Sequence, residues 1–89
     1  MKTLSQTKQF AKDVRRMRKR GKDLGKLQSI VVRLACGKPL DPQHRDHPLA
    51  GEWKNSRDCH IEPDWVLIYS EDEESLRLER TGSHSELFR

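Results

Sequence analysis

Apolar, aromatic and cysteine residues are scarce in this chain of 89 residues. Only 33% of the residues are hydrophobic, 6% are aromatic and two are cysteines. So few apolar side chains build one small core, and we expect a single domain over residues 1–89. Because 36% of the residues are charged, most side chains must lie near the surface, and any functional site is expected to be shallow.

Long hydrophobic stretches and paired cysteines are also absent. No run of about 18 apolar residues occurs, which excludes a transmembrane helix. The residues after Met1 lack the apolar stretch of a signal peptide, so we expect a cytoplasmic protein without a membrane partner. Cys36 and Cys59 have no CxxC spacing. Neither a disulfide framework nor a four-cysteine zinc site is expected, and both residues are predicted to be free thiols.

The net charge of +4 conceals a strong asymmetry along the chain. Residues 1–38 contain 12 Lys and Arg against two Asp and Glu, whereas residues 39–89 contain six against 12. Within residues 12–20 alone, six basic side chains accompany the single Asp13, which is more than solubility requires. This cluster predicts a surface that binds nucleic acid.

Two amphipathic helices are expected in the basic half. Apolar residues recur at helical spacing over residues 10–17, and this helix is expected to end near Gly21. A second apolar pattern covers residues 24–34, begins after Asp23 as a cap and stops at Gly37. Together they predict an antiparallel helical hairpin that opens the domain.

The second half has the pattern of strands. It begins with a loop over residues 38–48 that contains three prolines. We expect strands in a short segment around Trp53, at residues 57–61, at residues 65–69 as the central strand, and at residues 76–79, with the acidic residues 71–74 as a hairpin turn. The predicted fold class is α+β, with the N-terminal helical hairpin packed on a small, mainly antiparallel, curved sheet.

All four histidines lie in this second half. His47 precedes the first expected strand, His60 lies within a strand and His84 follows the last one. Functional sites are commonly built where elements begin and end. Asp58 shares a strand face with His60, because alternate residues of a strand point the same way, and Asp64 follows nearby. These imidazoles and carboxylates are predicted to gather on one sheet face.

Two kinds of chemistry use such a cluster. Imidazoles with a carboxylate suit zinc and related ions, although no HExxH or similar spacing is present. In metal-free RNA cleavage, a base instead takes the proton of a ribose 2′-OH, the oxygen attacks the phosphorus, and an acid protonates the departing 5′-oxygen. Histidine suits both tasks near neutral pH. Surface histidines without a function are also common, so the residues alone leave these interpretations open.

A cation and stacking surfaces would complete an RNA-cleaving site. Arg80, Arg57 and Lys54 are the basic residues nearest the histidines in sequence and are candidates to stabilise charge on the phosphorane. Trp65 and Phe88 are candidates to stack on bases. Burial tendency favours a core position for Trp65, whereas the near-terminal Phe88 suits either packing on the core or contact with a ligand.

The chain closely resembles the YafQ toxins, a branch of the RelE-like superfamily of bacterial toxin–antitoxin systems. Four segments carry the resemblance: DHPL at residues 46–49, RDCH at 57–60, EPDW at 62–65 and ERTGSHSELF at 79–88. Each segment alone is a weak signal, but together they are specific. The helical half is compatible as well, so the resemblance covers nearly the whole chain.

The resemblance implies an endoribonuclease that enters the decoding site of the ribosome and cuts messenger RNA. It also implies a cognate antitoxin that neutralises the toxin. We expect neither a cofactor nor a metal, and a monomeric toxin within a larger toxin–antitoxin complex. The family's active positions fall on His47, Asp58, His60, Asp64, Trp65, His84 and Phe88. His84 corresponds to the general acid. We infer that His60 or Asp64 is the base or an orienting group. His47 is then expected to hold the phosphate and Arg80 to stabilise charge.

Two other functions stay open at this point. A basic α+β domain could bind nucleic acid without catalysis, and the same superfamily includes toxins directed at gyrase, so fold alone does not decide. The histidines favour catalysis, because a simple binding module does not need three imidazoles and two carboxylates around one sheet face.

Overall fold

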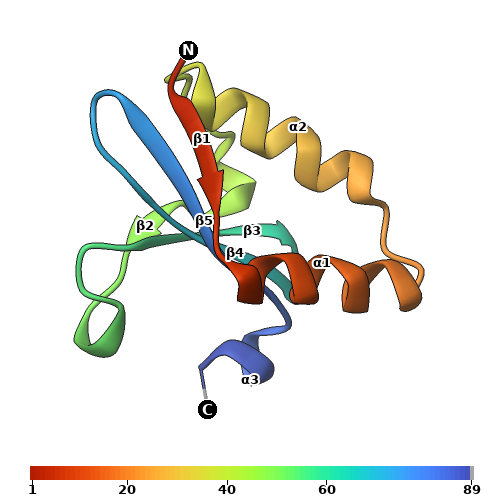
Figure 1. Ribbon diagram of the computed structural model, residues 1–89. Helices are drawn as coiled ribbons and strands as arrows, with labels where there is room; N and C mark the ends of the chain where they lie inside the picture. The colour runs from red at the N-terminus through yellow and green to blue at the C-terminus, as the bar shows by residue number, and fades with distance from the viewer. Residues whose placement is uncertain (89) are drawn as a thin grey trace.

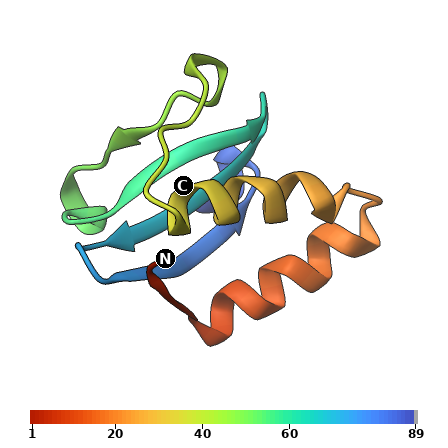
Figure 2. The same ribbon diagram turned by 90° about the horizontal axis from the view of Figure 1, so that it is seen from above.

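The computed structural model describes residues 1–88, and Arg89 lies outside the described residues. Two long helices pack on one face of a five-stranded sheet, and a short helix lies on the other (Figures 1 and 2). In chain order the elements are β1 (Thr3–Gln6), α1 (Lys8–Lys19), α2 (Leu24–Ala35), η1 (Pro42–His44), β2 (His47–Pro48), η2 (Gly51–Trp53), β3 (Arg57–Glu62), β4 (Trp65–Glu71), β5 (Ser75–Gly82) and α3 (His84–Leu87).

Local signals set the ends of the two long helices. Thr7 caps α1 and Asp23 caps α2, each by accepting a hydrogen bond of 2.9 Å from a backbone N–H of the first turn. Gly21 and Gly37 follow the two helices with φ of 79° and 71°, left-handed values that glycine adopts without strain. Both helices therefore begin and end where the sequence predicts. Within residues 1–88, every helix is too short or too polar to cross a lipid bilayer.

The helices do not open the domain, which corrects the predicted N-terminal hairpin. β1 precedes α1 and pairs in parallel with β5 at the edge of the sheet, where Leu4 lies opposite Leu76. All four residues of β1 are exposed. An edge strand of this kind is held by backbone hydrogen bonds and not by core side chains, so it has no hydrophobic pattern to detect.

The strand order is β1-β5-β4-β3-β2, so β4 is the central strand, as predicted. All pairs except β1 with β5 are antiparallel. The acidic segment forms the predicted turn between β4 and β5, where the Asp72 carboxylate accepts hydrogen bonds from the backbone N–H groups of Glu74 and Ser75. The strand expected around Trp53 is wrong, because η2 occupies that position and the two-residue β2 pairs with β3 instead.

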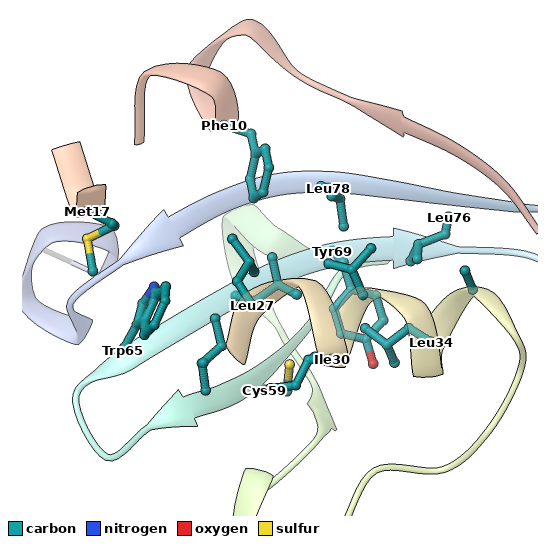
Figure 3. Close-up of a cluster of buried hydrophobic side chains, with 14 residues drawn as sticks. Phe10, Met17, Leu27, Ile30, Leu34, Cys59, Trp65, Tyr69, Leu76 and Leu78 are labelled. Carbon is teal, nitrogen blue, oxygen red and sulfur yellow. The ribbon is translucent and has the colours of Figure 1, made fainter. Parts of the chain in front are cut away.

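One face of the sheet forms the main core with α1 and α2 (Figure 3). Its centre is β4, whose Trp65, Leu67 and Tyr69 are fully buried beneath Met17 of α1 and Leu27 of α2. Each large apolar side chain that is fully buried contributes roughly 1.5–3 kcal/mol to folding. We call this surface of the sheet the core face.

Cys59 also lies on the core face, and it is 0% exposed. Burial raises the pKa of its thiol to about 12, so the thiolate needed for nucleophilic chemistry does not form near neutral pH. Cys59 is therefore an inert residue of the core. Cys36 is exposed, and both cysteines are free.

The opposite surface of the sheet has a much smaller apolar cluster. Val66 and Ile68 of β4 pack there against Leu87 of α3. Asp58 and His60 of β3 lie opposite Ile68 and Val66 in the antiparallel register, and directly opposed residues share a face. This surface, which we call the site face, therefore carries the candidate functional residues.

Candidate active site

His47 and Asp58 meet across the pairing of β2 with β3. The two residues are direct register partners, and Nδ1 of His47 lies 2.9 Å from Oδ1 of Asp58. The Nδ1 proton is donated to the backbone carbonyl of Arg45, 2.6 Å away. A carbonyl only accepts, so Nδ1 carries the proton, and Nε2 is the ring atom available to a ligand.

Asp58 is 2% exposed, and its Oδ1 has no hydrogen bond within residues 1–88. A buried carboxylate oxygen without a donor is costly and calls for a functional explanation. Burial raises the pKa of Asp58, and the charges of His47, His60 and His84 oppose that rise. His47 is in direct contact with this carboxylate, and His60 and His84 act on it by charge alone. We call His47, His60 and His84 the imidazole cluster.

His60 projects from the same face as Asp58, two residues further along β3. Its Nδ1 donates to the carbonyl of Pro63 at 3.2 Å, which again leaves Nε2 as the ring atom that can accept a proton. Pro63 belongs to the turn between β3 and β4, so the turn sets the orientation of the ring.

α3 carries His84, which is exposed. The backbone N–H of His84 donates to Oδ1 of Asp64 at 3.2 Å, so Asp64 holds the start of α3 beside the turn that ends β3. The His84 ring packs on Phe88, with ring centroids 4.8 Å apart and planes at 45°. Asp64 and Phe88 therefore fix His84 from two sides.

A second set of contacts joins α3 to the basic helix α1. Ser83 and Glu86 form a capping box at the start of α3. The Glu86 carboxylate also accepts two hydrogen bonds of 2.7 Å from Arg20 and lies 3.1 Å from Nε of Arg16. The Arg20 guanidinium and the Ser83 backbone N–H hold the pKa of Glu86 well below its usual range. Together these contacts fix a helix of only four residues.

Two of the predicted substrate-binding residues point elsewhere. Trp65 is 0% exposed, and its Nε1 donates to the Thr81 hydroxyl at 2.9 Å. The stacking role expected for Trp65 is therefore wrong, because its ring belongs to the core. Arg57 lies opposite Tyr69, and its Nε donates to Asp46 at 3.2 Å. It is thus directed to the core face, away from the histidines.

The other two basic candidates differ in their environment. The Arg80 side chain binds the fully buried Asp13 of α1, with Nε 2.7 Å from Oδ2. Burial of Asp13 works against ionisation, but hydrogen bonds from Arg80 and Gln9 hold the pKa of Asp13 below its usual value. Arg80 lies opposite Ile68 and hence two strands from Asp58, about 10 Å away. Lys54 is exposed in the loop after η2.

Several residues at this site are not among those predicted from the sequence. Leu49 and Trp53 are partly buried on the apolar cluster of the site face, and Arg45 supplies the carbonyl that orients His47. The S-x-x-E spacing of Ser83 and Glu86, a recognised helix-start signal, could have revealed α3. Within residues 1–88, no three side chains among His, Cys, Asp and Glu are grouped as ligands for a metal ion.

The sequence and the fold match known proteins. A family model described as "Bacterial toxin of type II toxin-antitoxin system, YafQ" matches residues 2–89. The chain belongs to the YafQ toxin family. The mRNA interferase toxin YafQ of Escherichia coli K12 is 48% identical over 81 residues, which cover 90% of this chain and 88% of that protein.

Solved structures of YafQ agree with the fold over its whole length. The crystal structure of YafQ from E. coli BL21(DE3) has a TM-score of 0.94 at 42% identity and covers 100% of both chains. The crystal structure of the E. coli DinJ–YafQ toxin–antitoxin complex contains a chain with a TM-score of 0.92 at 44% identity, covering 99% of this chain and 98% of that one. The resemblance to YafQ toxins seen in the sequence is confirmed.

Proposed function

We propose that this chain is an mRNA interferase, the toxin of a toxin–antitoxin pair, and that it cuts translated messages in the decoding site of the ribosome. One observation carries the proposal: on the site face of a YafQ toxin fold, His47 lies 2.9 Å from the buried Asp58, and His60 projects from the same face of β3. The E. coli relative that is 48% identical is named an mRNA interferase toxin, which supports the same activity here.

The geometry supports an acid–base mechanism. His60 is the base: its free Nε2 takes the proton of the ribose 2′-OH, and the oxygen attacks the adjacent phosphorus. His84 is the acid and protonates the departing 5′-oxygen, so the products are a 2′,3′-cyclic phosphate and a 5′-hydroxyl end. Asp64 positions His84, because the Asp64 carboxylate accepts a hydrogen bond from the backbone N–H of His84.

Charge on the phosphorane is balanced by His47 and by the field of Arg80. His47 presents Nε2 because its Nδ1 is held by Arg45 and lies beside Asp58. When His47 is protonated at Nε2, that atom donates a hydrogen bond to a phosphate oxygen. The contribution of Arg80 is the smaller one, because its guanidinium is paired with Asp13 and lies two strands from Asp58.

The basic face of α1 is the proposed docking surface for ribosomal RNA. Five of its side chains have no ion pair within residues 1–88: Lys8, Lys12, Arg15, Arg18 and Lys19. Unpaired cations on one helix attract a phosphate backbone. Ribosomal RNA would also provide walls around a site that is shallow in the free protein.

An antitoxin is the expected protein partner. A relative has been crystallised as the DinJ–YafQ toxin–antitoxin complex, and the basic half of this chain suits an acidic antitoxin segment. We propose that a cognate antitoxin binds the toxin in the cytoplasm and prevents it from entering the ribosome.

Primer extension on a translated message tests the proposed activity. Purified protein is added to translating ribosomes, and to the same mixture with the start codon of the message removed. We expect new message ends at codon-sized spacing only when the message is translated. A chelator of zinc and other transition ions, in buffer that retains magnesium, should leave the cleavage unchanged.

Other outcomes would favour the alternatives. An intact message together with inhibited gyrase would indicate a gyrase-directed toxin. An intact message on ribosomes that bind the protein would indicate a non-catalytic binding module. Cleavage restored only by zinc or manganese would indicate a metal enzyme and contradict the proposed mechanism.

A further inference from the structure

A polar hollow lies directly beside His60, where β3 extends past its short partner β2. β2 pairs only with Arg57 and Asp58, so the outer edge of β3 beyond them faces the η1 loop and the start of α2. The hollow encloses about 370 Å³, close to the lower limit of small-ligand sites. Six polar residues among those that line it are Lys26, Gln43, His44, Arg45, His60 and Glu62.

The charges around the hollow favour an anionic ligand. Its only carboxylate, Glu62, lies 2.9 Å from Nζ of Lys22 and 3.0 Å from Nζ of Lys26. The two lysines neutralise the Glu62 carboxylate, so Glu62 lines the hollow without making it negative. Arg45 is exposed, and its guanidinium has no ion pair within residues 1–88. A phosphate group is therefore matched to the free cation of Arg45.

Two further side chains can form hydrogen bonds with a base. Nδ1 of His44 donates to the backbone carbonyl of His60 at 2.7 Å, which leaves Nε2 of His44 free. Gln43 is exposed, and its amide offers both a donor and an acceptor. Proteins recognise unstacked RNA bases through such groups.

Arg45 connects this hollow to the imidazole cluster. Its backbone is left-handed, with φ of 47° and ψ of 45°, which is unusual for a residue other than glycine, asparagine or aspartate. In this conformation its carbonyl accepts the Nδ1 proton of His47 at 2.6 Å, and the same residue lines the hollow. One residue thus orients His47 and forms part of the wall of the adjacent cavity.

We propose that the hollow binds the nucleotide next to the scissile phosphate of the cut RNA strand. Gln43 and His44 contact its base, and Arg45 contacts its phosphate. The inference rests on the proposed function and extends it, because it assigns the selection of cleavage sites to residues 43–45. His60 lines the hollow and projects from the site face, so an RNA strand bound on the site face would reach the hollow across the outer edge of β3.

The test uses full-length Gln43→Ala and Arg45→Asn variants. Asparagine tolerates the left-handed backbone, so Arg45→Asn removes the cation and keeps the carbonyl that orients His47. Arg77→Gln, on the exposed side of β5, is the matched control for loss of one arginine. Each protein is added to ribosomes translating a message of mixed codons, the cut ends are sequenced, and affinity for ribosomes is measured separately.

We expect Gln43→Ala to reduce the preference for one base beside the cut by about tenfold. Arg45→Asn should slow cleavage at every site by about tenfold. Both variants and the control should keep the wild-type affinity for ribosomes.

Three results overturn the inference. An unchanged cleavage pattern and rate in both variants would show that the hollow does not contact the cut strand. An unchanged pattern with weaker ribosome binding would show that it holds ribosomal RNA. A wild-type protein that cuts no message would overturn the proposed function, and this inference with it.

Discussion

Oδ1 of Asp58 lies 2.9 Å from Nδ1 of His47, yet this oxygen accepts no hydrogen bond within residues 1–88. The Nδ1 proton is directed to the Arg45 carbonyl instead. The negative charge is therefore buried beside an imidazole without the compensation that a hydrogen bond provides. Such an arrangement lowers stability and, in the proposed mechanism, places a negative charge beside the imidazoles of the cleavage site.

Replacing Asp58 by asparagine separates these two effects. Burial raises the pKa of Asp58, so its ionised form destabilises the fold above that pKa. At pH 7 the free energy of unfolding of Asp58→Asn should be no lower than that of wild type, and we expect it to be higher by up to about 1 kcal/mol. The gain should disappear below about pH 3, where the carboxyl is protonated in both states. Cleavage should fall by at least about tenfold. Urea unfolding at both pH values and primer extension measure these effects, and lower stability of the variant at pH 7 would contradict the account.

Glu86→Gln tests the contact between α1 and α3. The pKa of Glu86 is lowered by Arg20, so its charge stabilises the fold above the unfolded-state pKa of about 4.3, and this stabilisation is lost as the pH falls further. We expect a loss of about 1 kcal/mol at pH 7 that shrinks at pH 3. Cleavage should also decrease, because α3 carries His84. Glu73→Gln, in the exposed turn between β4 and β5, is the control. A pH-independent difference in stability would show that the charge of Glu86 is unimportant.

The basic face of α1 makes a prediction about salt. The double variant Arg15→Gln, Arg18→Gln removes two cations that have no ion pair within residues 1–88. Its affinity for ribosomes should be weaker, and the slope of log affinity against log salt concentration should decrease by roughly 1.5. Cleavage at saturating protein should stay near the wild-type rate. An unchanged slope would exclude this face from docking, and a lower rate at saturation would point to damage at the site itself.

Trp65 and Phe88 provide a contrast between a core ring and a site ring. Trp65→Phe removes the hydrogen bond to Thr81 and should lower the free energy of unfolding by about 1–2 kcal/mol, while folded protein still cuts RNA. Phe88→Ala removes the ring packed on His84 and should reduce cleavage with a smaller loss of stability. Thermal unfolding and primer extension on both variants check this. The reverse pattern would restore Trp65 as a stacking residue.

Much of the fold could be predicted because strong local patterns coincide with it. The apolar periodicity of α1 and α2, the Asp23 cap and the continuous apolar run of β4 each reflect burial in the main core. β1 could not be predicted in this way, because its side chains are exposed and its stability comes from the backbone of β5. η2 was mistaken for a strand because Trp53 suggested a core position.

The site was predictable only in part. Histidines and carboxylates at the ends of elements indicated the imidazole cluster, and the YafQ resemblance added the expected role of His84. The directions of Arg57 and Arg80 could not be read from the sequence, since their carboxylate partners are far away along the chain. The role of Arg45 depends on a left-handed backbone, which has no sequence signal at an arginine.

Replacing His84 by alanine tests the central claim most directly. Cleavage of a translated message and binding to ribosomes are measured on the same preparation of protein, with thermal unfolding as the control for folding. The proposed acid–base mechanism predicts a loss of cleavage of about 100-fold or more, with the wild-type affinity for ribosomes retained. An equal loss of binding and cleavage would make His84 a docking residue, and cleavage at the wild-type rate would contradict the mechanism.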